Sequence, residues 1–290
     1  MNDNRTQTEQ AADALSACAE IAAQQDRERW LAASIAPAPE RARLAVLIAF
    51  NAEVARTRDV VTEAMLGLIR LQWWRETVSA AAAGTPRAHP VAEGLAALFP
   101  EGRVAEADLI ALIDARERDL ESEGLATLGD FLAYTDATAG MFNRIALELL
   151  GVDGESARTA ARHVARAVAI AGQLRSVAAN AARGRILLPR AFLGGHGVSI
   201  AGLLAGRPEA NLAAAARELA AIALGNLAAA RAMRAEVPRA ALPVLATARF
   251  AGHHLKRLEK ARYDLFGGTL EAAPLSAPLA VLAALVTGRY

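Results

Sequence analysis

Apolar residues recur every three or four positions along most of this 290-residue chain, and this spacing constrains the fold more than any other feature. It is the period of an α-helix with one buried face, whereas a half-buried strand alternates apolar and polar residues. Alanine and leucine dominate, and the β-branched and aromatic residues that favour strands are sparse. The pattern predicts an all-α protein.

Proline and glycine divide the chain into segments of helix length. The predicted helices lie near residues 9–33, 40–60, 65–83, 105–122, 127–150, 155–182, 208–235, 239–265 and 277–288. No linker is long and polar enough to separate two domains, and no repeat suggests a solenoid. The sequence therefore predicts a single-domain helical bundle over residues 1–290, with residues 1–8 disordered and 84–102 as a surface excursion.

The charge balance and the single cysteine exclude several functional classes. There are 32 basic and 31 acidic residues, so the net charge of +1 gives no global attraction to nucleic acid. Cys18 alone can form neither an intramolecular disulfide nor a cysteine metal cage, and its alanine-rich surroundings predict a small core residue. A reducing compartment fits this composition.

No targeting or membrane-spanning segment is predicted. The first ten residues, MNDNRTQTEQ, are polar where a secretory signal carries an apolar core. The apolar run 277–286 is about half as long as the roughly 20 residues of a membrane span. We expect a cytoplasmic protein without a transmembrane segment, and peripheral contact with the inner membrane stays open.

Two neighbouring stretches carry the most specific pattern in the chain. Residues 50–59 read FNAEVARTRD, and residues 70–76 read RLQWWRE. Adjacent tryptophans on an otherwise aromatic-poor helix predict an interior helix with partners on more than one side. Gln72 and its polar neighbours then either face solvent beside these core anchors or form the wall of a polar pocket.

Residues 44–76 resemble the squalene/phytoene synthase family, whose members share an all-helical isoprenoid-synthase fold. Three later stretches, 131–150, 173–189 and 242–264, resemble the same family, so the likeness covers most of residues 20–266. It implies a bundle of the isoprenoid-synthase type with a central cavity. It also implies head-to-head condensation of two prenyl diphosphates, with magnesium ions bridging the diphosphates to aspartates on two facing helices.

The first family signature is incomplete in this chain. The family's two leading aspartates would fall on Ala55 and Arg56, which leaves Asp59 as the third. Mg²⁺ requires carboxylate oxygens, and Asp59 and Glu63, four residues apart, are the remaining weak candidates for a metal ligand or catalytic pair. Arg56 and Arg58 beside them would repel the ion and favour ion pairs instead.

The second signature departs further from the family. Its first aspartate falls on Asn180, and the spacer that carries its second is shortened to Ala181–Ala182. Residues 156–208 contain no aspartate or glutamate. This segment therefore has no carboxylates to bind a metal ion, and no cofactor is expected. Mg²⁺ would be needed only under the alternative function given below.

Arginines on the same segments could hold an anion without a metal, because a guanidinium group binds phosphate oxygens directly. The candidate ligand-binding residues are Arg56, Arg58, Arg70, Gln72, Gln173, Arg175, Arg183 and Arg185. For Gln173 and Arg175 a structural role is equally open. Arg158, Arg162 and Arg166, spaced by four, are predicted to form a solvated helix face.

Other polar groupings predict structural roles. Acidic residues at 114–123 alternate with Arg116 and Arg118, which is typical of an exposed, ion-paired helix end. His163, His253 and His254 lack the ligand spacing of a zinc site. No metal site is therefore predicted from these groups.

The leading hypothesis is a family member that has lost magnesium-dependent prenyl transfer and acts as a binding or assembly protein. It resembles the branch related to a mitochondrial complex I assembly factor, which keeps the FN-x-E and LQWWR features seen here at 50–53 and 71–75. Its expected partners are a protein of the complex and a prenyl or other anionic lipid. The alternative is an active prenyl diphosphate transferase, squalene or phytoene synthase-like, that uses Asp59, Glu63 and Asp136 with Mg²⁺. Whether the chain is an enzyme stays open at this point.

Overall fold

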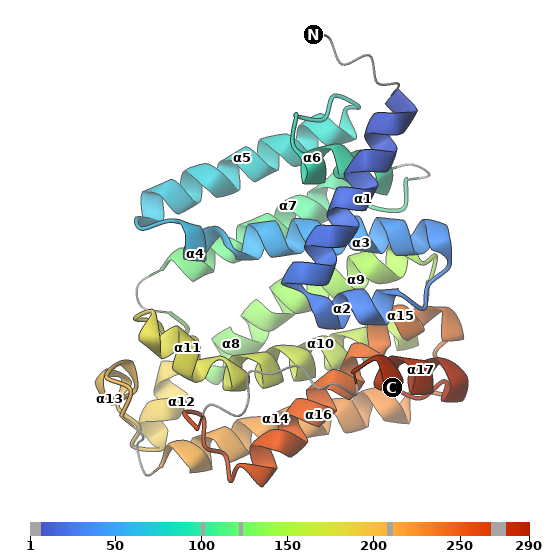
Figure 1. Cartoon of the computed structure of the whole chain (residues 1–290). Helices are drawn as coiled ribbons and strands as arrows, with labels where there is room; N and C mark the ends of the chain where they lie inside the picture. Colours follow the sequence, from blue (N-terminus) through green and yellow to red (C-terminus); the bar gives the residue numbers. More distant parts are fainter. Residues whose placement is uncertain (1–6, 100–101, 122–123, 208–210, 268–276) are drawn as a thin grey trace. The chain divides into compact units, whose positions relative to one another are not determined.

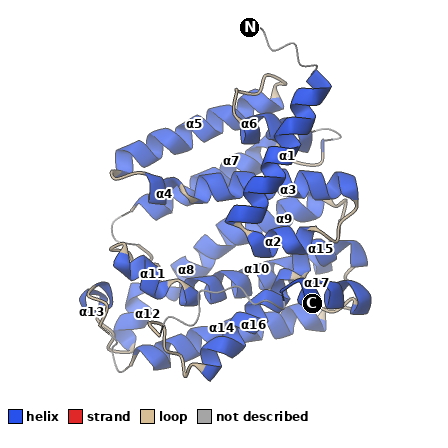
Figure 2. Ribbon diagram, in the orientation of Figure 1, coloured by secondary structure: helices blue, strands red, loops and turns tan. Residues whose placement is uncertain are grey.

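The computed structural model describes residues 7–99, 102–121, 124–207, 211–267 and 277–290. These residues form helices and connecting loops and include no strand, so the prediction of an all-α protein is confirmed (Figure 2). Contacts divide the chain into two compact units. Unit 1 comprises Met1–Leu120 and Met141–Asp153, and unit 2 comprises Glu121–Gly140 and Gly154–Tyr290. That residues 1–290 form a single domain stays a prediction.

Unit 1 is built on α1, α3 and α5. Its helices are α1 (Gln7–Gln25), α2 (Arg27–Ala33), α3 (Ala38–Ala55), α4 (Thr57–Val60), α5 (Ala64–Ala82), α6 (Pro90–Leu95), α7 (Glu106–Asp114) and α9 (Met141–Leu149), with short 3₁₀ turns at Ala96–Leu98 and Ala115–Leu120. Helix α1 crosses α3 and α6, and α5 packs against α7 (Figure 1). Residues 1–6, most of the segment predicted to be disordered, lie outside the described residues.

Two of the helices predicted in unit 1 are each divided in two. The predicted helix 9–33 breaks at Asp26, whose carboxylate accepts a hydrogen bond from the Arg29 amide and so caps α2. The predicted helix 40–60 breaks at Arg56, between α3 and α4. The boundaries of α5 agree with the prediction to within one residue.

The segment predicted as a surface excursion contains part of the core. Val91, Ala92 and Leu95 of α6 are fully buried. A side chain at Gly94 would place its Cβ 2.8 Å from the Cys18 sulfur, so glycine is needed for α6 to approach α1 this closely. Cys18 is fully buried as predicted, and burial raises the pKa of its thiol to about 12, which keeps it protonated and unreactive.

Unit 2 is arranged around the long helix α10 (Glu155–Arg175). The other helices are α8 (Leu128–Thr135), α11 (Val177–Ala182), α12 (Arg190–Gly195), α13 (Ile200–Leu204), α14 (Leu212–Ala232), α15 (Leu242–Leu245), α16 (Thr247–Lys260) and α17 (Ala277–Thr287), with a π-helical turn at Asp136–Gly140 and a 3₁₀ turn at Arg239–Ala241. Helices α14 and α16 and the π-helical turn pack against α10 (Figure 1). Gly194 and Gly195 are the last two residues of α12.

Helix α14 alone, among the described residues, has the length and apolarity of a membrane-spanning helix. It packs against α10 and α16 within unit 2, and its buried residues include Leu219 and Ala223. The absence of a transmembrane segment stays a prediction.

Candidate functional site

In unit 1 two of the arginines predicted to bind an anion contact a carboxylate of the chain itself. Glu53, on α3, accepts a hydrogen bond from Nη1 of Arg56 at 3.1 Å and from Nη2 of Arg70 on α5 at 2.8 Å. The Glu53 side chain is 13% exposed, and those of Arg56 and Arg70 are 42% and 32% exposed. One internal carboxylate therefore balances two of the candidate cations.

Glu53→Ala is expected to lower the free energy of unfolding by about 2 kcal/mol, because it leaves Arg56 and Arg70 close together without a counter-charge. The loss stays below that for a fully buried pair, since both guanidinium groups reach solvent. Urea denaturation of Glu53→Ala, Arg70→Ala and the double variant measures the coupling, expected at about 1 kcal/mol. Strictly additive effects would contradict the assigned ion pair.

The other candidate residues of unit 1 contact residues three or four positions away in the sequence. Nη1 of Arg58 donates to the Val61 carbonyl oxygen at 3.4 Å. The Gln72 amide donates to Glu76 at 3.2 Å, and its oxygen accepts from Arg75 at 3.4 Å. Gln72 is therefore on the exposed side of α5.

Arg75 joins α5 to the acidic segment at 114–123. Its Nε lies 2.7 Å from Asp114, and its Nη2 is hydrogen-bonded to Glu117. Arg116 also pairs with Asp119 at 3.5 Å and donates to Asn51 at 3.4 Å. Asp114, Glu117 and Asp119 are therefore ion-paired, as predicted for this helix end, and Glu123 lies outside the described residues.

The adjacent tryptophans differ in their surroundings. Trp74 is fully buried against Phe50 and His89, whereas Trp73 is half-buried, with the Arg87 guanidinium 5.6 Å from its ring centroid. The prediction of an interior helix is wrong for α5 as a whole, because residues such as Met65 and Ile69 leave one side exposed.

Asp59 and Glu63 do not share one helical face. Asp59 lies in α4, which ends at Val60, and Val61 is extended with φ −117° and ψ 146°. Glu63 is also extended and precedes α5. The four-residue spacing predicted a common face only for a continuous helix, and the break removes that premise.

Asp136 is the third acid that an active prenyl transferase was predicted to use. Both of its carboxylate oxygens are bound to one arginine. It lies at the start of the π-helical turn in unit 2, and Arg166 of α10 donates Nε and Nη2 to its two oxygens at 2.7 and 2.5 Å. This hydrogen bonding raises the pKa of Arg166. The prediction that Arg166 is solvated is wrong, whereas Arg158 and Arg162 are exposed as predicted.

The second signature region forms the end of α10 and the whole of α11. Asn180, which stands where the family has an aspartate, is buried, and its side-chain amide donates to the Ser176 hydroxyl at 3.1 Å. Gln173 has a buried side-chain oxygen without a hydrogen-bond partner. Arg183 is exposed and Arg185 is half-buried in the loop that follows α11. Within the described residues, no group of three or more histidine, cysteine or acidic side chains is placed to hold a metal ion.

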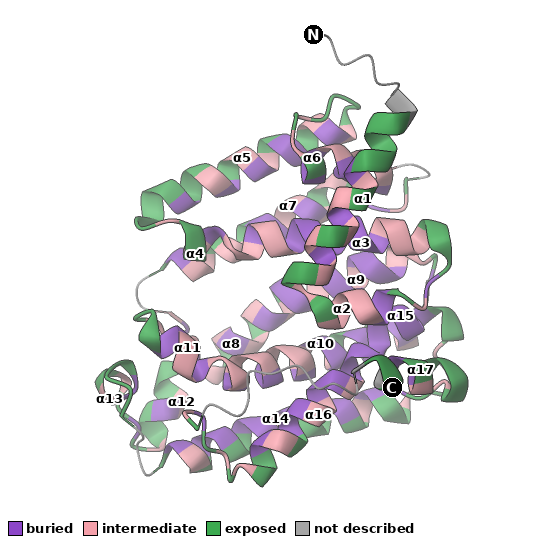
Figure 3. Ribbon diagram, viewed as in Figure 1, coloured by how far each residue is buried: buried purple, intermediate pink, exposed green. Residues whose placement is uncertain are grey.

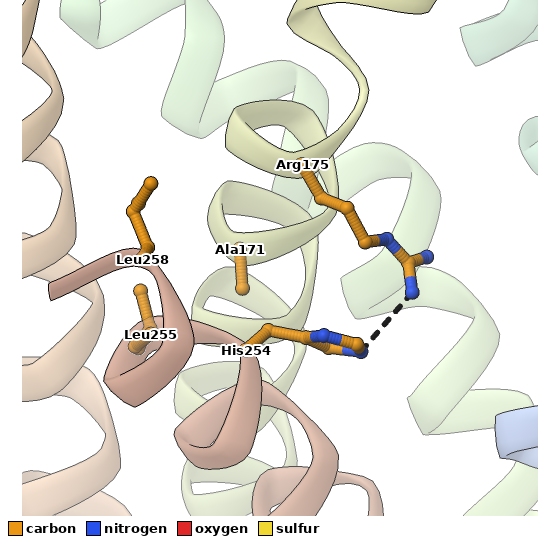
Figure 4. Close-up of a pocket in the computed structure, with 5 residues that line it drawn as sticks. All are labelled: Ala171, Arg175, His254, Leu255 and Leu258. Atoms are coloured by element: carbon orange, nitrogen blue, oxygen red, sulfur yellow. Dashed lines mark hydrogen bonds between the residues drawn. The ribbon is translucent and has the colours of Figure 1, made fainter. Parts of the chain in front are cut away.

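Arg175 faces a histidine. Its Nη1 lies 3.0 Å from Nε2 of His254 on α16, and because arginine only donates, Nε2 accepts in this contact (Figure 4). Ala171, Leu255 and Leu258 complete the lining of a cavity of about 10 Å³, which is room for about one water molecule. Arg175 thus has a structural role within unit 2, and its predicted role in ligand binding stays a prediction.

The comparisons with known proteins agree with the motifs. The family model described as squalene/phytoene synthase matches residues 22–278. The chain belongs to the squalene/phytoene synthase family. Squalene synthase HpnC from Alicyclobacillus acidocaldarius, 18% identical, superposes with a TM-score of 0.76 over 87% of this chain and 95% of that one, so this family member has the isoprenoid-synthase fold.

Two curated relatives of this family member differ in how much of it they match. Complex I assembly factor 6 of Mus musculus is 28% identical over 264 residues, 91% of this chain and 79% of that protein. Presqualene diphosphate synthase of Sinorhizobium fredii is also 28% identical, but over 136 residues, 46% of this chain and 47% of that one. The resemblance to the assembly factor therefore extends along almost the whole chain.

Glu53 was not among the site residues predicted from the sequence. Its contact with Arg56 could have been predicted, because residues three apart are neighbours on a helix. The pairing with Arg70 had no local signal, because seventeen residues and a helix break separate the two. That the candidate arginines bind an anion stays a prediction.

Proposed function

We propose that this squalene/phytoene synthase family member is an assembly protein for respiratory complex I and does not catalyse magnesium-dependent prenyl transfer. The observation that carries the proposal is the extent of similarity, which covers 91% of the chain for the assembly factor and 46% for the presqualene diphosphate synthase at equal identity. We propose that it acts in the cytoplasm, in contact with the inner membrane.

The acidic side chains support this proposal, because they do not fit the magnesium ions that the fold family implies. Two acid clusters would have to offer several carboxylate oxygens to each ion. Asp59 and Glu63 are separated by an extended segment, and Asp136 is bound through both oxygens to Arg166. Asn180 offers an amide that already donates to Ser176.

An exposed apolar surface in unit 1 supports a protein partner. The α5 patch consists of Val60, Met65, Leu66, Leu68 and Ile69, and the side chains of Met65 and Ile69 are 63% and 59% exposed. Figure 3 shows the first part of α5 coloured as exposed. Large apolar side chains exposed close together in the chain are typical of a contact surface, whereas on an ordinary surface they are scattered singly.

The charged residues beside the α5 patch indicate which kind of molecule binds there. Asp59 and Glu63 are exposed beside it, and Arg58 is half-buried there. An apolar centre with both signs of charge at its edge is the anatomy of a protein–protein interface, and exposed acids would oppose an anionic lipid surface. The partner is therefore a protein surface with an apolar centre and a rim of mixed charge.

Deletion of the gene in its source organism is expected to abolish most NADH oxidation by complex I, and the wild-type gene should restore it. A Met65→Ser/Ile69→Ser variant should restore less than about a tenth of the activity, because it removes two apolar contacts worth roughly 1 kcal/mol or more each. Leu224→Ser, which alters an exposed leucine of α14, is the matched control and should restore activity fully.

Immunoblotting in the same strains establishes that the variants accumulate to the wild-type level. Normal complex I activity in the deletion strain would contradict the proposed function. If the Met65→Ser/Ile69→Ser variant restores activity fully, the proposed function still stands, but the α5 patch is not the surface that binds the partner.

A further inference from the structure

Helix α17 is apolar on its outer side as well as on its inner side. Val281 and Ala284 are buried, and α17 packs against α16. The opposite side carries Leu279, Leu282, Leu285 and Val286, of which Leu279 and Val286 are 67% and 71% exposed. A surface helix of a globular protein normally has a polar outer face, and one that is apolar all round requires a second cover.

Arginines of unit 2 surround the carboxyl end of this helix. Arg239 donates to the Leu285 carbonyl at 3.2 Å, Arg249 to that of Arg289 at 2.9 Å, and Arg231 to that of Tyr290 at 2.9 Å. Burial and the nearby charges of Arg231 and Arg289 lower the pKa of Arg249, as expected where cations are crowded. Capping of carbonyls uses one or two of the five N–H donors of each guanidinium, so its positive charge remains available.

A cavity of about 420 Å³ adjoins the exposed side of α17. Arg234 and Arg239 line it, together with apolar side chains that include Leu242, Leu245 and Val286. Val286 belongs both to the cavity wall and to the exposed face of α17. Cationic and apolar groups therefore meet at one place on unit 2.

Most of the charged side chains around this surface are basic. Residues 237–258 and 277–290 contain no aspartate or glutamate, and their basic residues are Arg239, Arg249, Lys256, Arg257 and Arg289. Glu236, at the edge of the cavity-lining segment, is hydrogen-bonded to Ser156 at 2.7 Å. The α5 patch in unit 1 has acids at its rim, whereas here apolar side chains are bordered by arginines. A border in which arginines outnumber acids matches an anionic lipid surface better than a protein with mixed charge.

We propose that the outer face of α17, with Arg234, Arg239, Arg249 and Arg289 beside it, docks on an anionic lipid bilayer. Leu279, Leu282 and Val286 enter the interface between head groups and acyl chains, and the arginines contact lipid phosphates. The residues of this surface belong to unit 2, whereas the α5 patch belongs to unit 1.

Sedimentation with lipid vesicles tests the proposal on the full-length protein. The wild type should bind vesicles of phosphatidylcholine and phosphatidylglycerol, bind pure phosphatidylcholine far more weakly, and lose affinity as salt increases. Arg234→Gln and Arg239→Gln should each lower the affinity about fivefold. Leu279→Ser/Leu282→Ser should lower it on the order of tenfold.

Matched controls separate this surface from general charge and hydrophobicity. Arg207→Gln and Leu224→Ser alter an exposed arginine and an exposed leucine elsewhere in unit 2 and should bind like the wild type. Circular dichroism of each variant establishes that it is folded. The proposal is wrong if the wild type does not bind anionic vesicles, if it binds neutral vesicles equally, or if the α17 variant binds undiminished. It is also wrong if the α17 variant loses only self-association.

Discussion

Replacing Trp74 with alanine is expected to lower the free energy of unfolding by about 3–5 kcal/mol, the largest effect of any single substitution considered for this chain. Trp74 is fully buried, and its ring meets Phe50, Trp73 and His89 edge-on at centroid distances of 5.6, 4.8 and 5.5 Å. Alanine would leave a cavity between α3, α5 and α6 that their backbones cannot fill without moving. Urea denaturation followed by tryptophan fluorescence and circular dichroism measures the loss.

Two further variants test whether the loss of stability comes from the packing of the buried Trp74 ring. Trp73→Ala should cost clearly less, because Trp73 is only half-buried. Trp74→Phe should also cost less, since it keeps most of the packing and the indole N–H that it removes has no hydrogen-bond partner. Equal losses for Trp73→Ala and Trp74→Ala would contradict the assignment of Trp74 as the core anchor of unit 1.

The long helices were predictable from the sequence because they contain several turns. Helix α5 was expected at 65–83 and extends over Ala64–Ala82. Helices α6, α12 and α13 have six, six and five residues, which is less than two turns, so no apolar period could reveal them. Only tertiary packing shows that Val91 and Leu95 of α6 belong to the core.

The candidate site was predictable where its contacts are local. The spacing of Glu53 and Arg56 could be read from the sequence. The break between Asp59 and Glu63 could also be expected, because the β-branched run Val-Val-Thr at 60–62 disfavours a continuous helix. The pair of Asp136 and Arg166 spans thirty residues and depends on how the π-helical turn meets α10. No period or spacing encodes that contact.

The second large effect concerns catalysis. Ionisation of a prenyl diphosphate places negative charge on the departing diphosphate, and in this family magnesium held by carboxylates stabilises that charge. Here Asp136 is neutralised by Arg166, and Arg56 and Arg70 are balanced by Glu53. We therefore expect no release of diphosphate above the rate without protein, a difference of many orders of magnitude from a working synthase.

The most direct measurement is the release of diphosphate from farnesyl or geranylgeranyl diphosphate by the purified protein in the presence of Mg²⁺. A synthase of the same family serves as the positive control, and Asp59→Asn tests the acid that remains from the first signature. The wild type, Asp59→Asn and buffer should all show the same background release. Sustained, magnesium-dependent turnover by the wild type that Asp59→Asn abolishes would contradict the loss of prenyl transfer.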